Sequence, residues 1–155
     1  SYASYALDNW KRIDPQGPIA LGNIALIQNF LGGLDEEWFI LVHIEIEAEA
    51  APALEAILLS QQAVLEDRPE KLGAHLRVIA SSLHAMYETL CRMQEGCDPY
   101  IYYNRVRPYI HGWKNHPFQN GNKRSYIRKA NKTFICFSTF FFYGRGNPGF
   151  TNKIN

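Results

Sequence analysis

The chain has 155 residues, of which 46% are hydrophobic, and a formal net charge of +1, as expected for one globular domain or part of one. No stretch approaches the roughly 18 apolar residues of a membrane-spanning helix, and charges near the start exclude a signal peptide. The three cysteines form no CxxC pair, which argues against a disulfide framework and for a cytoplasmic protein. Because the chain begins at Ser1 rather than Met, we expect it to be processed or a fragment.

The near-neutral net charge conceals two unlike stretches. Through Asp98 the chain has 6 basic and 15 acidic residues, and from Pro99 onward it has 10 basic and no acidic residues. A basic stretch with interleaved aromatic residues can bind nucleic acid, but no RNA- or DNA-binding motif is present. We therefore expect neither a nucleic-acid partner nor a membrane partner.

The first predicted element is a short helix over residues 24–30, where apolar residues recur at helical spacing. A loop signal over residues 14–18, which contains two prolines and a glycine, comes before it. Gly32-Gly33 should end it.

Residues 34–65 are ambiguous, because His43 to Ala50 alternates apolar and polar residues as a strand does. We predict a helix instead. The segment opens on three acids suited to a helix N-terminus, is rich in Ala and Glu, and is far too long for one strand. Pro52 should kink or restart this helix.

The clearest helix covers residues 67–94, with Asp67 as its N-cap, Pro69 in its first turn and Gly96 just beyond its end. Apolar residues recur along it every three or four positions. These are Leu72, Leu76, Ile79, Leu83, Met86, Leu90 and Met93.

A further helix should begin at Asp98-Pro99, be limited by Pro108 and close at Gly112. Residues 22–113 are thus predicted to be mainly helical, and the fold class to be all-α. From Pro117 the helical pattern fails. The uncharged, β-prone run over residues 133–143 could form an aggregation-prone strand.

Two basic side chains lie among apolar residues, and the residues alone leave each with two interpretations. His43 is either a hydrogen-bonded core histidine or a pocket residue that donates to a ligand or accepts its proton. Arg107 is either a surface arginine stacked on tyrosines or a clamp for a carboxylate. No HExxH or other close metal-ligand spacing occurs. His75 and His84 are expected to be surface or hydrogen-bonded residues of their helix and not metal ligands.

The acids Glu45, Glu47 and Glu49 are expected to form a solvated or helix-pairing face rather than a metal site. No residue of the chain is therefore assigned as a metal ligand. Residue patterns alone predict a helical domain with an aromatic pocket, one histidine and one arginine.

Four stretches, taken together in order and spacing, resemble one protein family. They are Asn9-Trp10-Lys11-Arg12 with Asp14-Pro15 and Pro18-Ile19, Asp35-Glu36-Glu37-Trp38-Phe39-Ile40-Leu41-Val42-His43, Glu47-Ala48-Glu49-Ala50-Ala51-Pro52-Ala53, and Arg105-Val106-Arg107-Pro108-Tyr109-Ile110-His111-Gly112-Trp113-Lys114-Asn115-His116-Pro117. From Tyr2 to Pro117, about three quarters of the chain, the sequence resembles indoleamine 2,3-dioxygenase.

The resemblance implies that residues 1–117 are the helical part of the family's large haem-binding domain. Residues 118–155 match nothing downstream in the family, and we expect an irregular, disordered tail or a gene-model artefact. The resemblance also assigns the substrate-binding residues. Arg107 would bind the substrate carboxylate. Tyr102 and Tyr103 would contact the substrate and the haem edge. Phe39 would pack against the indole, and Tyr2 would line the pocket.

His43 would lie on the distal side of haem b, over the oxygen-binding face, as the catalytic residue. The proximal histidine of the family lies beyond the matched stretch, so no cofactor-binding residue is assigned here. The implied reaction uses O2 to cleave the indole C2–C3 bond of tryptophan or a related indoleamine, giving N-formylkynurenine. The alternatives are a haem enzyme acting on a modified tryptophan and a non-catalytic truncated fragment or interaction module.

Overall fold

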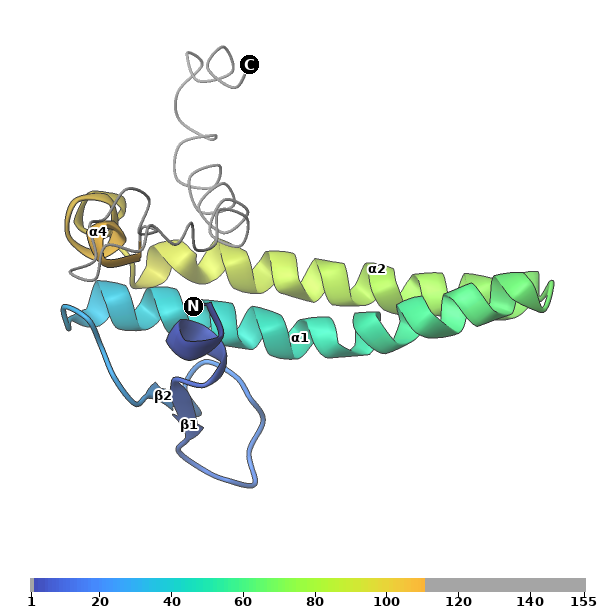
Figure 1. Cartoon of the computed structure of the whole chain (residues 1–155), viewed down its shortest axis with the longest axis horizontal. Helices are drawn as coiled ribbons and strands as arrows, with labels where there is room; N and C mark the ends of the chain where they lie inside the picture. Colours follow the sequence, from blue (N-terminus) through green and yellow to red (C-terminus); the bar gives the residue numbers. More distant parts are fainter. Residues whose placement is uncertain (1, 111–155) are drawn as a thin grey trace, which may run out of the picture.

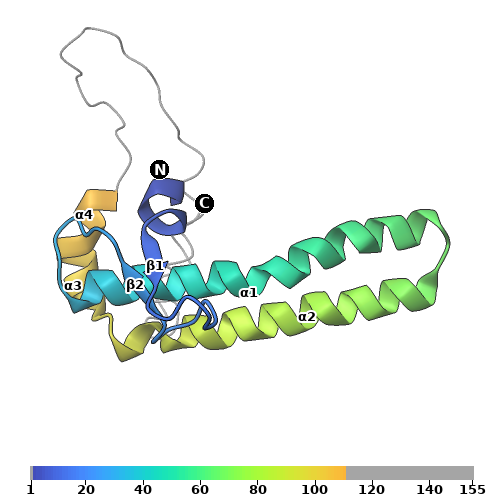
Figure 2. The same ribbon diagram turned by 90° about the horizontal axis from the view of Figure 1, so that it is seen from below.

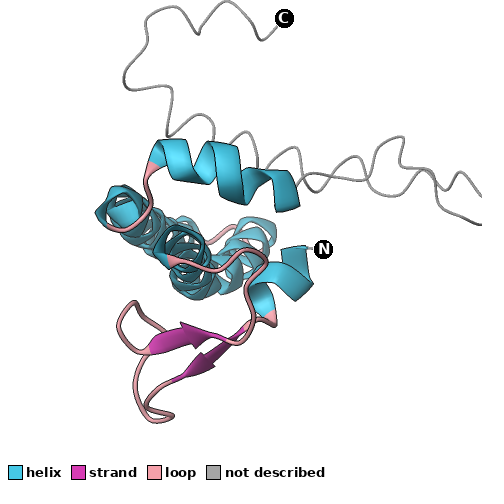
Figure 3. Ribbon diagram, turned by 90° about the vertical axis from the view of Figure 1, so that its left-hand side faces the viewer, coloured by secondary structure: helices cyan, strands magenta, loops and turns pink. Residues whose placement is uncertain are grey.

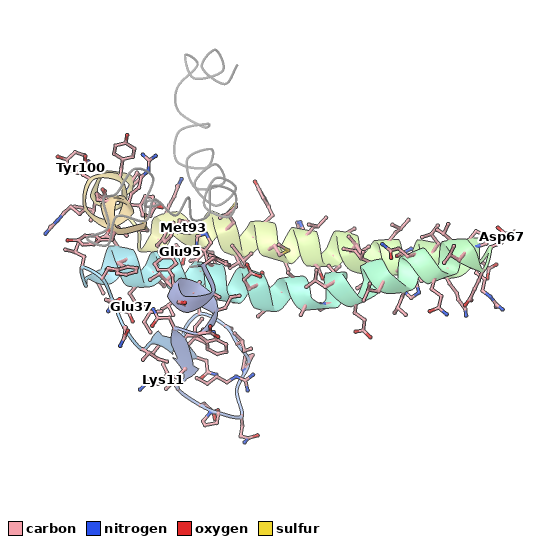
Figure 4. All side chains as sticks on the ribbon, in the orientation of Figure 1. Lys11, Glu37, Asp67, Met93, Glu95 and Tyr100 are labelled. Carbon is pink, nitrogen blue, oxygen red and sulfur yellow. The ribbon has the colours of Figure 1, made fainter. Side chains whose placement is uncertain are left out.

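The computed structural model describes residues 2–110, and two long helices dominate it (Figure 1). Helices α1 (Leu34–Leu65) and α2 (Pro69–Cys91) form a hairpin, and the 3-10 turn η2 (Arg92–Glu95) continues α2. The turn of this hairpin, marked by Asp67, lies at the end remote from the N-terminal segment (Figure 4). All other described elements gather at the opposite end, which we call the base of the hairpin.

The elements at the base are short. They are the π-helical turn η1 (Ala3–Leu7), the strands β1 (Trp10–Arg12) and β2 (Ile24–Leu26), and the helical run α3 (Pro99–Ile101), η3 (Tyr102–Val106) and α4 (Arg107–Ile110). The strands pair antiparallel, with Trp10 opposite Leu26 and Arg12 opposite Ile24. Figure 3 shows the strands on one side of the long helices and the run α3–α4 on another.

The prediction of a mainly helical, all-α chain is confirmed, with the small strand pair as an addition. The ambiguous segment is the helix α1, and it continues through Pro52 without restarting. Figure 2 shows its axis changing direction part-way along. The clear helix is α2, and Asp98 caps the next helical run by accepting hydrogen bonds from the backbone N–H groups of Tyr100 and Ile101.

The short helix predicted for residues 24–30 is wrong, because residues 24–26 form the strand β2. The partner strand lies at Trp10–Arg12, so the pairing is non-local and local spacing does not reveal it. The Asn23 side chain fixes the intervening loop by donating to the carbonyls of Asp14 and Pro18. The backbone N–H and C=O groups of this segment are therefore bonded through the β1–β2 pair and its loop instead of within a helix.

Two predicted helix boundaries are also wrong. Asp67 is not the N-cap of α2, because it adopts φ 52° in the tight turn and the cap position falls to Arg68. Pro108 does not end the last helical run but lies inside α4. Pro108 is the second residue of α4, and in the first turn of a helix the N–H that proline lacks would have no acceptor within that helix. The predicted stop at Gly112 and the predicted tail lie outside the described residues.

The core of the described part lies at the base of the hairpin. Its largest fully buried side chains include Phe39, Ile40 and Val42 of α1, with Met93 and Val106 packed around them. We call residues 50–65 of α1, with the part of α2 that packs on them, the outer half of the hairpin. There α1 buries only small residues, at spacings of three and four: Ala53, Ala56, Ser60 and Ala63. Small residues let two helices approach closely, so their large neighbours point outward.

The outer half of the hairpin therefore exposes large apolar side chains. They are Leu54, Ile57, Leu58, Leu59, Val64 and Leu65 on α1, and Leu76, Val78, Leu83 and Tyr87 on α2. Leu65 is 88% exposed. Even so, among residues 2–110 there is no helix long and apolar enough to span a membrane.

Gly96 allows η2 to pack on α1, which generates a stability prediction. A Cβ at Gly96 would lie 2.6 Å from Trp38 Cγ, whereas a Cβ at Gly73 in α2 would meet nothing within 4 Å. We expect Gly96→Ala to destabilise the chain by about 1–3 kcal/mol through overpacking. The control Gly73→Ala should stabilise it by about 0.5–1 kcal/mol, since Gly costs entropy inside a helix. Urea unfolding measures both, and equal effects would contradict the assignment of Gly96.

Candidate functional site

Three of the predicted site residues form one buried ring cluster at the base of the hairpin. The Phe39 ring lies 4.5 Å from the His43 ring and 4.3 Å from the Tyr102 ring, measured between centroids. Phe39 and His43 are one turn apart on α1, and Tyr102 opens η3, more than sixty residues later. Phe39, His43 and Tyr102 are all buried. The cluster is apolar and aromatic, and its polar ring atoms are the two nitrogens of His43.

A hydrogen bond of His43 determines which of its ring nitrogens carries the hydrogen. Nδ1 lies 2.6 Å from the carbonyl oxygen of Phe39. A carbonyl only accepts, so Nδ1 carries the hydrogen and donates it, and Nε2 holds the lone pair of the neutral ring. Burial lowers the pKa of His43 from 6.5 to about 4, although the Phe39 carbonyl acts in the opposite direction. His43 is therefore neutral at pH 7.

Arg107 and Tyr103 form a second pair on the helical run that carries Tyr102. The guanidinium carbon of Arg107 lies 4.7 Å from the Tyr103 ring centroid, at cation–π distance. Arg107 is half-buried and Tyr103 is 44% exposed. The predicted stacking of Arg107 on a tyrosine is thus present, and its guanidinium N–H groups are suited to a planar anion.

Tyr2 approaches α1 one turn beyond His43. Its hydroxyl donates to Glu47 Oε1 over 2.7 Å. Burial, followed by this hydrogen bond and the charge of Glu47, raises the pKa of the Tyr2 phenol well above its usual 10. Tyr2 stays protonated at neutral pH, and it is tied to the same helix that carries Phe39 and His43.

The three acids predicted to form one solvated or helix-pairing face bond different segments: Glu49 bonds the other long helix, whereas Glu45 and Glu47 bond the N-terminal segment. Thr89 of α2 donates to Glu49 Oε1 over 2.9 Å, and the backbone N–H of Leu21 donates to Glu45 Oε2 over 3.2 Å. Burial is the main cause that raises the pKa of Glu49, and the charges of Glu45 and Glu88 add to it. Within residues 2–110 no three His, Cys, Asp or Glu side chains gather as a metal site would require.

Sequence reasoning missed the buried carboxylate of Glu36, which bonds the segment before α1. Glu36, in the first turn of α1, accepts backbone hydrogen bonds from Phe30, Leu31 and Gly32 over 2.7, 2.9 and 2.9 Å. Phe30 stacks on Tyr5, with centroids 5.7 Å apart. The available signal was a Glu at the third position of a helix, where a capping box places one.

Comparison with known proteins identifies the family of the chain. A family model for indoleamine 2,3-dioxygenase matches residues 1–134. The chain belongs to the indoleamine 2,3-dioxygenase family. It is 38% identical over 117 residues to indoleamine 2,3-dioxygenase 1 of Rattus norvegicus, and 34% identical over 116 residues to indoleamine 2,3-dioxygenase 2 of Homo sapiens. It is 30% identical over 124 residues to indoleamine 2,3-dioxygenase of Saccharomyces cerevisiae.

These matches cover most of the chain but a small part of each relative. They include 76%, 75% and 74% of this chain, and 29%, 28% and 27% of the rat, human and yeast proteins respectively. The chain thus spans less than a third of the length of these family members. The family model matches residues up to 134, beyond Pro117. The predicted domain boundary at residue 117 stays a prediction.

Residues 2–110 contain three histidines, His43, His75 and His84. An axial iron ligand must be a histidine or similar donor that faces the metal. His43 donates its Nδ1 hydrogen to the Phe39 carbonyl, an arrangement that metal-binding histidines also adopt, and the exposed His84 lies 3.4 Å from Glu88 on its own helix. His75 lies on α2, in the outer half of the hairpin.

The buried neutral His43 makes stability depend on pH. The unfolded chain takes up a proton near pH 6.5 and the folded chain only near pH 4. The free energy of unfolding should fall by about 3 kcal/mol as pH drops through this window, and this share should be flat above it. His43→Phe should remove that share and His84→Gln should not. Urea unfolding between pH 4 and 7.5 tests this, and an unchanged slope in His43→Phe would contradict it.

Proposed function

We propose that this chain supplies the substrate-binding side of a haem-dependent dioxygenase that cleaves the indole C2–C3 bond of tryptophan with O2, giving N-formylkynurenine. Membership of the indoleamine 2,3-dioxygenase family supports this activity. The observation that carries the proposal is the contact of Phe39 with both His43 and Tyr102. Tryptophan or a related indoleamine and O2 are the proposed small-molecule partners, and a cytoplasmic location stays a prediction.

The aromatic cluster suits an indole ring. Phe39 and Tyr102 stack on each other with centroids 4.3 Å apart, and a planar heterocycle would pack beside this apolar ring pair. Tyr103 follows Tyr102 directly and holds the Arg107 guanidinium. The indole would lie against the rings of the cluster, and the amino-acid end of the substrate would point toward Arg107. Tyr2, fixed to Glu47, would line the same slot.

Arg107 would fix the substrate by its carboxylate. A guanidinium offers donors in a planar fork that matches a carboxylate with two hydrogen bonds. Its contact with Tyr103 restricts the arginine side chain before the substrate arrives. A restrained donor loses less conformational entropy on binding, so the same contact holds the substrate more tightly.

His43 would act as a hydrogen-bond acceptor toward the indole N–H. Its Nδ1 hydrogen is directed to the Phe39 carbonyl, which leaves Nε2 as the accepting nitrogen. The low pKa keeps that nitrogen unprotonated at pH 7. Haem b, when bound by a family-length protein, would supply the oxygen chemistry. The residues of this chain would orient the indole and keep water out.

Arg107→Ala tests the substrate grip in a family-length protein that carries these residues. Losing a two-pronged charge contact should cost about 2–5 kcal/mol, expressed as weaker tryptophan binding and slower turnover. Haem content should stay nearly unchanged, because Arg107 would bind the substrate. Arg105→Ala, which removes the exposed arginine two residues earlier, is the matched control. Kinetics like those of the unaltered protein would remove Arg107 from the site.

The 155-residue chain alone should neither retain stoichiometric haem nor oxidise tryptophan. By the family resemblance the proximal histidine lies beyond the matched stretch, and an enzyme of this kind needs a closed, dry site. The exposed leucines of the outer hairpin should also make the isolated chain poorly soluble. N-formylkynurenine formation under reducing conditions, with haem supplied, measures the activity. Robust turnover would mean that another group binds the iron and that the chain is not a non-catalytic fragment.

A further inference from the structure

Two acids in the first turn of α1 reach the chain segments on either side of the ring cluster. Asp35 Oδ1 accepts a hydrogen bond from the backbone N–H of Asp98 over 2.7 Å. Glu36 accepts three, from the N–H groups of residues 30–32. Glu36 is 1% exposed, so its carboxylate exchanges water entirely for these donors. Charge-assisted hydrogen bonds of this kind are about twice as strong as neutral ones.

The contacts of Glu36 lead to the far end of the helical run that carries Arg107. Glu36 holds the backbone of Phe30, and the Phe30 ring stacks on Tyr109 with centroids 6.3 Å apart. The same ring stacks on Tyr5 of η1. Tyr109 comes two residues after Arg107, so Glu36 is linked to the end of this run through one ring contact.

The contact of Asp35 leads to the beginning of the same run. Asp35 holds the backbone of Asp98, and Asp98 caps α3 through the N–H groups of Tyr100 and Ile101. Tyr102 then stacks on Phe39, one turn after Asp35 on α1. Both ends of the run over residues 99–110 are therefore connected by contacts to the first turn of α1.

We propose that Asp35 and Glu36 are positioning residues that set where the run over residues 99–110 lies against Phe39 and His43. They would act on the substrate site through Tyr102 and Arg107, without contacting the substrate. The inference rests on the proposed function for its meaning in catalysis. The placement itself can be measured without substrate or haem.

The test uses nuclear magnetic resonance of an isotopically labelled family-length protein that carries these residues. The readouts are the cross-peaks between the Phe39 and Tyr102 rings and the chemical shift of the Arg107 Nε–H, which senses the Tyr103 ring. Asp35→Ala removes one acceptor, and Asp35→Asn keeps an oxygen that can accept from Asp98. Glu36→Gln places an amide against backbone donors and loses at least one of three contacts. Glu37→Gln, the next acid along and labelled in Figure 4, is the matched control.

Spectra are recorded well below the unfolding temperature of each variant, so that lost stability alone does not change them. Glu36→Gln and Asp35→Ala should lose Phe39–Tyr102 cross-peak intensity and shift the Arg107 signal. Glu37→Gln and Asp35→Asn should match the unaltered chain. If Glu36→Gln does not fold, Asp35→Ala decides, because it leaves the three bonds of Glu36 in place.

Unchanged ring cross-peaks and an unchanged Arg107 signal in the folded variants, beside lower unfolding temperatures, would overturn the proposal. The two acids would then stabilise the fold without placing the site. A family-length protein that fails to oxidise tryptophan would overturn the proposed function and leave this placement intact. The two failures are thus distinguishable.

Discussion

The structure depends on the complete burial of one stretch of α1. All residues from 39 to 45 are buried, and a helix can be buried on every side only if other segments surround it. The elements α2, η1, β2, η2 and η3 do so, each packing against α1. The short elements at the base are stable because they pack on this stretch of α1. Few of them could be stable alone. The ring cluster lies there for the same reason.

The outer half of the hairpin lacks such a cover among residues 2–110. Its helices meet through small side chains, and leucines such as Leu58 and Leu65 point outward. An apolar surface of this kind belongs to a larger core or an interface. The relatives are more than three times longer than the matched stretch, which agrees with a larger core.

The long helices could be predicted from sequence because their end signals are local. The strand-like alternation at Glu45, Glu47 and Glu49 misleads, and the structure explains it. The three acids are distributed around a helix, where they bond the Leu21 backbone, the Tyr2 hydroxyl and the Thr89 hydroxyl respectively. The strand β2 could not be predicted in the same way. Its stability comes from a partner strand twelve or more residues earlier and from side-chain bonds across the loop.

For the site, helical spacing predicts that Phe39 lies beside His43 and that Tyr103 lies beside Arg107, since each pair is four residues apart. It does not predict that Phe39 meets Tyr102, because that contact joins segments more than sixty residues apart. The family resemblance supplied this link, and the structure supplies its physical cause. Acids at a helix start are ordinarily explained by the helix dipole. Here Asp35 and Glu36 also make specific bonds to the flanking segments. The same turn that begins α1 therefore also fixes what packs against it.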